Sequence, residues 1–222
     1  MDLRVAPDAA GAAAEAASWT AHHLRNAVLR RGSATLAVSG GMTPVAMFVA
    51  LATMEVPWDN LTVFQVDERV APDGDAARNA PLLDLFPVDE SHRRLMPVTD
   101  ADLRAAADRY AGELPERFDM VHLGLGDDGH TASWPPGDGV VDSTVSVALC
   151  GLYRGHVRMT LTPVVVNAAR HRVVLAAGSD KAAALERWLL GDLDVPAQHL
   201  RRSDTVVVVD QAAAVRLPGP HR

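Results

Sequence analysis

The residues best suited to chemistry in this 222-residue sequence stand in one short turn, GLGDDGH, from Gly124 to His130. Histidine titrates near neutral pH, and a carboxylate from Asp127 or Asp128 beside it can orient the imidazole for proton transfer. An apolar run over residues 120–125 leads into the turn and is typical of a buried strand. His130 is therefore the first candidate for a catalytic acid or base.

The same turn has an alternative interpretation as a dinucleotide site. GLGDDG satisfies the G-x-G-x-x-G pattern, but that pattern must open a helix whose N-terminus meets the pyrophosphate. Pro135, Pro136, Gly137 and Gly139 follow Gly129 within ten residues and exclude a helix of useful length. The prolines therefore argue against a nicotinamide cofactor.

Three consecutive charged residues, Asp67, Glu68 and Arg69, end another apolar run. Burying them is costly unless each charge meets a partner, solvent or a ligand. Arg69 suits a phosphate, and Asp67 suits sugar hydroxyls or proton transfer, whereas the alternative is a surface cluster of salt bridges. A metal site from Asp67, Asp128 and His130 is conceivable, but no close spacing of His or Cys supports it.

The segment SGGMTP, from Ser39 to Pro44, follows a short β-branched run. Gly40 and Gly41 allow backbone N–H groups to face a ligand, and a helix with Thr43 as its N-cap adds its positive end, so the segment suits phosphate. An ordinary tight turn is the alternative. A relaxed nucleophile elbow at Ser39 is another, although such an elbow normally follows several strands.

Gly178 to Lys181, reading GSDK, opens another predicted helix. A cation in the first helical turn is disfavoured by about 0.3–1 kcal/mol because of the helix dipole. Either a bound phosphate or the neighbouring Asp180 can offset that cost. Lys181 is therefore a candidate ligand-binding residue.

Strands and helices alternate along the chain, which predicts an α/β fold: a three-layer αβα sandwich around a mostly parallel sheet. Ligands are expected at the carboxyl ends of its strands, where the four segments above stand. Strands are predicted at 35–38, 61–66, 120–125, 145–149, 157–161, 173–177 and 206–209. Helices are predicted from 13 to near Gly32 and at 44–52, 81–86, 100–114 and 179–190.

Composition indicates one domain, residues 1–222, with 48% hydrophobic residues and a net charge of −7. No basic block would track nucleic acid, and no apolar stretch approaches the length of about 20 residues that spans a membrane. The Ala-rich start lacks the basic flank of a signal peptide, so a cytoplasmic protein is expected. The lone Cys150 is expected to be a core residue, and the tail from Leu217 to be a frayed end.

Taken together, these segments resemble the 6-phosphogluconolactonase family. The matching motifs are SGG-x-TP, VDERV with the later Asn79, GLGDDGHTAS with PPG, RMTLTP and GSDKA, in the family's order between Ser39 and Lys181. The resemblance implies the αβα fold shared with glucosamine-6-phosphate deaminases, no required cofactor or metal, and hydrolysis of a phosphorylated sugar lactone in the pentose phosphate pathway. A monomer or small homo-oligomer is expected.

Carried over residue by residue, the resemblance makes His130 the acid/base that activates water against the lactone carbonyl. Asp67 and Asp128 would orient the substrate and the histidine. The phosphate would be held by a loop and by cations: Ser39, Gly40, Gly41, Thr43, Arg69 and Lys181, with Arg158 of RMTLTP as a secondary candidate.

The sequence departs from the family's pattern at three places. Met42 replaces a serine, Arg78 replaces the serine usual before Asn79, and Trp134-Pro135-Pro136 replaces Leu-Phe-Pro. These changes are expected to reshape the rim of the pocket and to affect substrate affinity.

Single residues distinguish a lactonase from two rival functions, a deaminase and a regulatory domain. Deaminases of this fold carry a glutamate five residues after the histidine, and this chain has Pro135 there; they also favour DEY where this chain has DER. A regulatory domain that only binds sugar phosphates would keep the phosphate loops but not His130. Hydrolysis of a lactone is therefore the favoured function.

Overall fold

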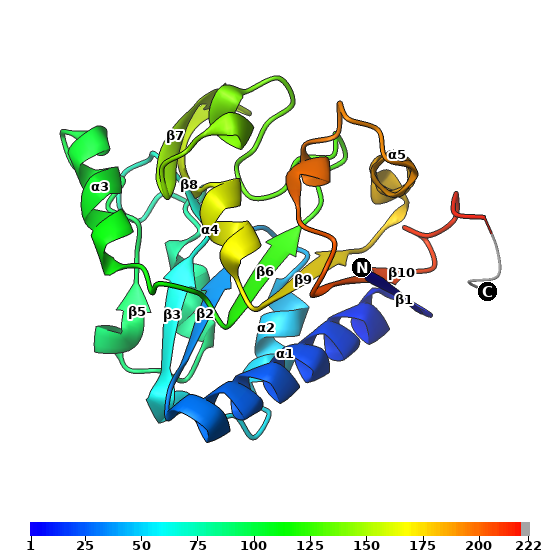
Figure 1. The fold of residues 1–222 in the computed structure, drawn as a ribbon, viewed down its shortest axis with the longest axis horizontal. Helices are drawn as coiled ribbons and strands as arrows, with labels where there is room; N and C mark the ends of the chain where they lie inside the picture. The colour runs from blue at the N-terminus through cyan, green and yellow to red at the C-terminus, as the bar shows by residue number, and fades with distance from the viewer. Residues whose placement is uncertain (219–222) are drawn as a thin grey trace.

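A seven-stranded parallel sheet forms the centre of the computed structural model, which describes residues 1–218 (Figure 1). Its order is β1-β10-β9-β6-β2-β3-β5, and each neighbouring pair runs parallel. The strands are β1 (Asp2–Ala6), β2 (Ala34–Val38), β3 (Leu61–Gln65), β5 (Arg93–Arg94), β6 (Met120–Gly124), β9 (His171–Ala176) and β10 (Thr205–Asp210).

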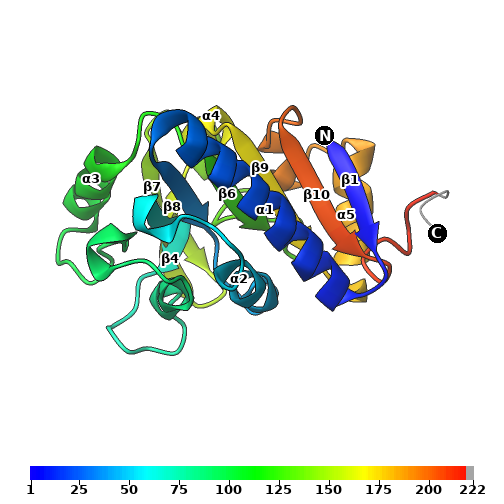
Figure 2. The same cartoon turned by 90° about the horizontal axis from the view of Figure 1, so that it is seen from below.

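Helices cover both faces of this sheet (Figure 2). One face is packed by α1 (Ala9–Arg31) and α2 (Val45–Ala52), and the other by α3 (Leu103–Glu113), α4 (Pro163–Ala168) and α5 (Ala182–Leu190). Each face has its own cluster of buried apolar residues, because strands buried on both sides direct apolar side chains to both faces. The predicted α/β fold with a mostly parallel sheet is confirmed.

The opening helix shows why these boundaries arise. Asp8 accepts a hydrogen bond from the Gly11 N–H (2.8 Å) at the N-terminus of α1, and Gly32 ends the helix in the left-handed conformation with φ 80°. Between these caps, small residues such as Ala13 and Ala17 form the buried face. A stripe of alanines lets the helix approach the sheet closely.

A second, three-stranded sheet of order β4-β8-β7 was not predicted. It consists of β4 (Asp67–Arg69), β7 (Val147–Tyr153) and β8 (His156–Leu161), paired antiparallel. The runs at 145–149 and 157–161 are strands, but assigning them to the parallel sheet was wrong. Only Arg154 and Gly155 separate β7 from β8, and a parallel pair needs a crossover of about a dozen residues or more.

Smaller differences from the predicted elements also have local causes. The edge strand β1 was missed because it is half-exposed and lacks a clear apolar pattern. Residues 80–85 form a 3-10 helix with Pro81 in its first turn, and α2 begins at Val45 with Pro44 as its N-cap, so the predicted cap at Thr43 is wrong. Leu217 packs against the core, and residues 219–222 of the predicted frayed tail lie outside the described residues.

Cys150 is buried, as predicted, with 2% of its surface exposed. Across the described helices, none combines the length and the apolar character needed to cross a membrane.

Candidate active site

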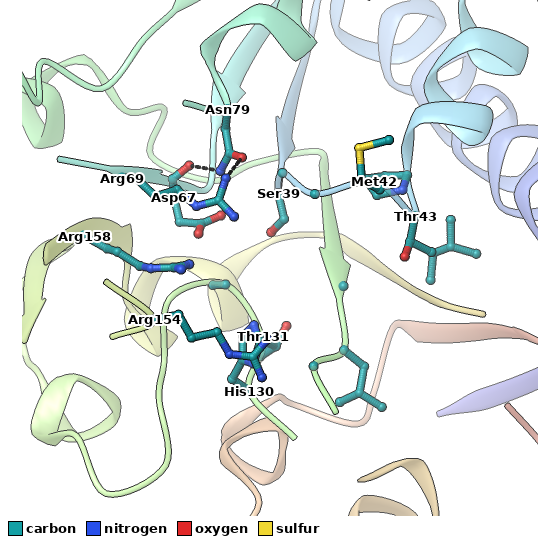
Figure 3. Close-up of a pocket in the computed structure, with 18 of the residues that line it drawn as sticks. Ser39, Met42, Thr43, Asp67, Arg69, Asn79, His130, Thr131, Arg154 and Arg158 are labelled. Carbon is teal, nitrogen blue, oxygen red and sulfur yellow. Dashed lines mark hydrogen bonds between the residues drawn. The ribbon is translucent and has the colours of Figure 1, made fainter. Parts of the chain in front are cut away.

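A pocket of about 200 Å³ opens at the carboxyl edge of the parallel sheet (Figure 3). Loops that follow β2, β6 and β9 meet there with β4 and β8 of the small sheet. Every predicted site residue except Asp128 lines it: Ser39, Gly40, Gly41, Thr43, Asp67, Arg69, His130, Arg158 and Lys181. The tertiary structure therefore brings together the segments that the sequence singled out.

The imidazole of His130 is held from behind by a carboxylate and a phenol. Its Nδ1 lies 2.6 Å from Asp128 Oδ1 and 3.0 Å from the hydroxyl of Tyr153, which in turn donates to Asp128 Oδ2. Burial by itself raises the pKa of Asp128, but the hydrogen bonds from His130 and Tyr153 outweigh it and hold that pKa well below the usual range. Asp128 is therefore ionised and accepts the Nδ1 proton.

Gly126 makes room for this arrangement. A Cβ at that position would overlap the His130 ring at Nδ1, and the Gly126 N–H donates to the His130 carbonyl (2.8 Å) to close the turn. The turn stays outside any helix, which agrees with the rejection of the dinucleotide interpretation. Gly126 therefore leaves the space that the imidazole of His130 occupies.

Two arginines and one carboxylate line one side of the pocket: Asp67 and Arg158 are buried, and Arg69 is half-buried. Arg69 donates to Asn79 Oδ1 (2.6 Å), while Asp67, only 4% exposed, accepts from the Ser133 hydroxyl (2.6 Å). Burial, followed by the charge of Arg69, lowers the pKa of Arg158. Neither Arg69 Nε nor Arg158 Nε has a hydrogen-bond partner within residues 1–218. Because both guanidinium groups line the pocket, they favour an anion in it.

Glu68 fixes the loop behind this side of the pocket. Its fully buried carboxylate accepts from the side chain of Gln65 (2.8 Å) and from the backbone N–H groups of Asn79 and Ala80 (both 2.8 Å). Arg78 Nε lies 3.2 Å from the same carboxylate. The alternative of a surface salt-bridge cluster at residues 67–69 is therefore wrong.

Two of the three departures from the family's pattern do not lie at the rim. The Arg78 side chain is 6% exposed, because it reaches inward to Glu68. Trp134 is fully buried and donates from Nε1 to the Leu161 carbonyl (2.8 Å). Only Met42, which is 87% exposed, stands at the mouth of the pocket, so the expectation that the other two reshape the rim is corrected.

The pocket is also lined by the glycine loop of residues 39–43 and by Lys181. Lys181 Nζ pairs with Asp180 (2.9 Å), and the preceding Gly178, at φ 97°, donates its N–H to Asp210 (3.0 Å). Ser39 is 5% exposed and its hydroxyl has no partner within residues 1–218, while Gly40 is required because a Cβ there would overlap Asn79. Of these groups, only the Ser39 hydroxyl is left without a partner among the described residues, while Lys181 is engaged by Asp180.

Two residues near His130 were missed by reasoning from the sequence. Tyr153 is the last residue of β7, and Arg154 is the first residue of the turn to β8; Arg154 lines the pocket and pairs with Asp127. The available signal was the short interval between two apolar runs, which indicates a hairpin, but it does not say which loop the hairpin turn contacts. Across residues 1–218, no three His, Cys, Asp or Glu side chains gather closely enough to hold a metal ion.

Comparison with known proteins identifies the family of the chain. Residues 7–209 match the model of the family described as glucosamine-6-phosphate isomerases/6-phosphogluconolactonase. The chain is 34% identical to a 6-phosphogluconolactonase of Synechocystis, over 87% of this chain and 89% of that one, and 35% identical to one of Streptomyces coelicolor, over 85% and 84%. The crystal structure of a 6-phosphogluconolactonase from Shewanella baltica matches with a TM-score of 0.85 and 26% identity, over 95% of this chain and 97% of that one. With most of its length matched in sequence and in structure, the chain belongs to the glucosamine-6-phosphate isomerase/6-phosphogluconolactonase family.

Proposed function

We propose that this chain hydrolyses 6-phosphogluconolactone to 6-phosphogluconate in the oxidative pentose phosphate pathway. The observation that carries the proposal is one pocket that is lined by His130, whose Nδ1 pairs with Asp128, and by the cations Arg69, Arg158 and Lys181. A lactone ester at one end of the substrate and a phosphate at the other require those two kinds of group. The 6-phosphogluconolactonases to which the chain is similar support the same reaction.

The reaction needs one proton carrier. Because Asp128 holds the proton on Nδ1, Nε2 of His130 is free to accept a proton from water as the water oxygen attacks the lactone carbonyl. The tetrahedral intermediate then breaks its bond to the ring oxygen, and that oxygen receives the proton from Nε2. Asp128 stabilises the imidazolium between the two steps, and a lactone is reactive enough that no serine nucleophile is needed.

The phosphate end is bound by charge. Arg69 and Arg158 lie close enough that each opposes the other's charge, and a dianion between them would relieve that repulsion. Lys181 and the N–H groups of residues 39–43 complete the phosphate site, while Asp67 orients the sugar hydroxyls. No cofactor enters this scheme, and we infer that the protein acts in the cytoplasm as a monomer or small homo-oligomer.

The second candidate is a glucosamine-6-phosphate deaminase, which is favoured only by the shared fold. Pro135 occupies the position of the glutamate expected for its proton relay, and it does not line the pocket. Release of ammonia from glucosamine 6-phosphate at a rate above that without protein would support the deaminase and contradict the lactonase.

The test is hydrolysis of freshly generated 6-phosphogluconolactone, with the spontaneous rate subtracted. We expect the purified protein to accelerate hydrolysis and His130→Ala to lose at least about 100-fold in kcat, the low end for general acid–base catalysis, with an unchanged melting temperature. His22→Ala is the matched control, because His22 is exposed and lies at the other edge of the sheet. Hydrolysis no faster than the spontaneous reaction would rule out the lactonase function.

A further inference from the structure

The turn between β7 and β8 touches the catalytic loop at two consecutive residues. Tyr153 pairs with His156 across the hairpin, and Arg154 (φ 48°) and Gly155 (φ 86°) form a two-residue turn with both φ angles positive. Positive φ is uncommon for arginine, so this backbone is held by its surroundings. Tyr153 contacts Asp128 while Arg154 contacts Asp127, and the small sheet therefore holds the loop that carries His130.

The protons of this cluster can be assigned one by one. Asp128 is ionised and can only accept, so Nδ1 of His130 carries the proton directed at Oδ1, 2.6 Å away. The Tyr153 hydroxyl uses its own proton on Oδ2, so the phenol oxygen can face the Nδ1 proton, 3.0 Å away, only as a second acceptor. Removing the hydroxyl leaves Oδ2 with only Arg154, 3.8 Å distant.

We propose that Tyr153 is a positioning residue that acts through Asp128: its hydroxyl locks the carboxylate in the rotamer that holds the proton on His130 Nδ1 and so keeps Nε2 as the base. Tyr153 does not line the pocket, so this role is separate from substrate binding. The inference rests on the proposed lactonase function for its kinetic test but not for its spectroscopic one.

The phenol ring has a different role from its hydroxyl. The guanidinium carbons of Arg154 and Arg158 lie 5.4 and 5.1 Å from the ring centroid, within cation–π range. Tyr153→Phe keeps the ring beneath both arginines and removes only the oxygen, whereas Tyr153→Leu also removes the ring. The two variants therefore separate the position of the base from the position of the cations that face the substrate.

For Tyr153→Phe we expect kcat to fall between about 10-fold and 100-fold, the range that corresponds to one hydrogen bond to a charged group, with KM changed less than about twofold. Tyr153→Leu should lower kcat similarly and also raise KM. Tyr110→Phe is the matched control, since the buried Tyr110 hydroxyl bonds only backbone groups; it should lower the melting temperature and leave kcat and KM unchanged. A kcat for Tyr153→Phe within twofold of the parent would overturn the inference.

A second measurement tests the cluster in the unaltered protein. Nitrogen-15 NMR of labelled histidine, with the resonance identified by its loss in His130→Gln, should show Nδ1 protonated and Nε2 unprotonated above neutral pH, and a mixture of tautomers in Tyr153→Phe. Equal tautomer populations in the parent would contradict the proposed lock. Because this signal needs no turnover, failure of the positioning role is distinguishable from failure of the lactonase function.

Discussion

Arginines and histidines line a hollow at each edge of the parallel sheet. The two hollows differ in the partners of these side chains. At the carboxyl edge, His130, Arg69, Arg154 and Arg158 surround the pocket described above. At the amino edge, a wider hollow of about 450 Å³ is lined by His22, His23, Asn26, Ala27, Arg30, Arg31, Arg117, Asp119, Arg170, His171 and Asp204. Similar residue types therefore occur at both edges.

Three of the four arginines that line the amino-edge hollow are engaged by other groups of the protein. The side chain of Asp119 is 10% exposed; it pairs with Arg31 (2.5 Å) and Arg170 (3.3 Å) and accepts from the Thr35 N–H (2.9 Å). Arg117 donates to the Ala168 carbonyl (2.6 Å). These charges join α1 and the loops before β6 and β9, so they stabilise the fold.

The histidines of the two hollows also differ in their hydrogen-bond partners. His23 and His171 pack against each other as tilted rings, with centroids 3.8 Å apart and an interplanar angle of 37°, and no hydrogen bond joins either ring to a carboxylate within residues 1–218. Burial, and then the charge of His171, lowers the pKa of His23 to about 4. His130 instead has a carboxylate at hydrogen-bond distance. The histidine that we propose as catalytic is thus distinguished by its oriented ring, not by basic neighbours alone.

The largest effect expected from this comparison is on the two aspartates. Asp128→Asn should lower kcat by about 10³-fold, within the range for losing an oriented general base, because an amide no longer fixes the proton on Nδ1. Asp119→Asn should keep kcat and lower the free energy of unfolding by about 2–3 kcal/mol, since a buried carboxylate with three donors is lost. Lactonase kinetics and urea unfolding of both variants would measure this contrast. A normal kcat for Asp128→Asn would contradict the proposed role of Asp128 in catalysis.

A smaller effect is expected on substrate binding. Arg69→Ala should mainly raise KM, by about 10- to 100-fold, which corresponds to the loss of a hydrogen-bonded cation at the phosphate. Arg30→Ala, at the exposed rim of the other hollow, should leave KM unchanged. Initial rates at varied lactone concentration are the measurement. Equal KM values in the parent and in Arg69→Ala would exclude Arg69 as a phosphate anchor.

The smallest effect concerns stability and pH. His23 takes up a proton near pH 6.5 when unfolded and at about pH 4 when folded. Over that window the unfolded state binds more protons, so stability falls as the pH is lowered from 6.5 to 4. His23→Phe keeps the stacked ring and removes the titration, so its unfolding midpoint in urea should decline less between pH 6.5 and 4, with kcat at pH 7.5 unaltered. Parallel declines in the two proteins would contradict the pKa shift.

Much of the site could be predicted because it follows strands with strong sequence signals. The apolar runs before Ser39, Asp67 and His130 predict parallel strands, and parallel strands bring their carboxyl ends to one edge. The small sheet was less predictable. The run before Tyr153 has the same composition as a parallel strand, and only the length of the connection to β8 shows that it must turn back.

The side chains that departed from the family's pattern were the least predictable. A charged Arg78 suggests an exposed position, but the buried carboxylate of Glu68 draws it inward. Trp134, in a Pro-rich loop, lies in the core because its indole N–H finds the Leu161 carbonyl. In both cases the partner lies in a different segment of the chain, so the local sequence carries no sign of it.

By itself, the sequence determined the parallel sheet, the order of its loops and the identity of His130 as the candidate base. Those features depend on periodicity, glycine and proline, which act over a few neighbouring residues. Tertiary structure decided that Tyr153, 25 residues away, meets Asp128, and that the amino-edge arginines are engaged by Asp119. Such contacts arise from how the small sheet and the loops pack onto the large one, and no local pattern in the chain specifies that packing.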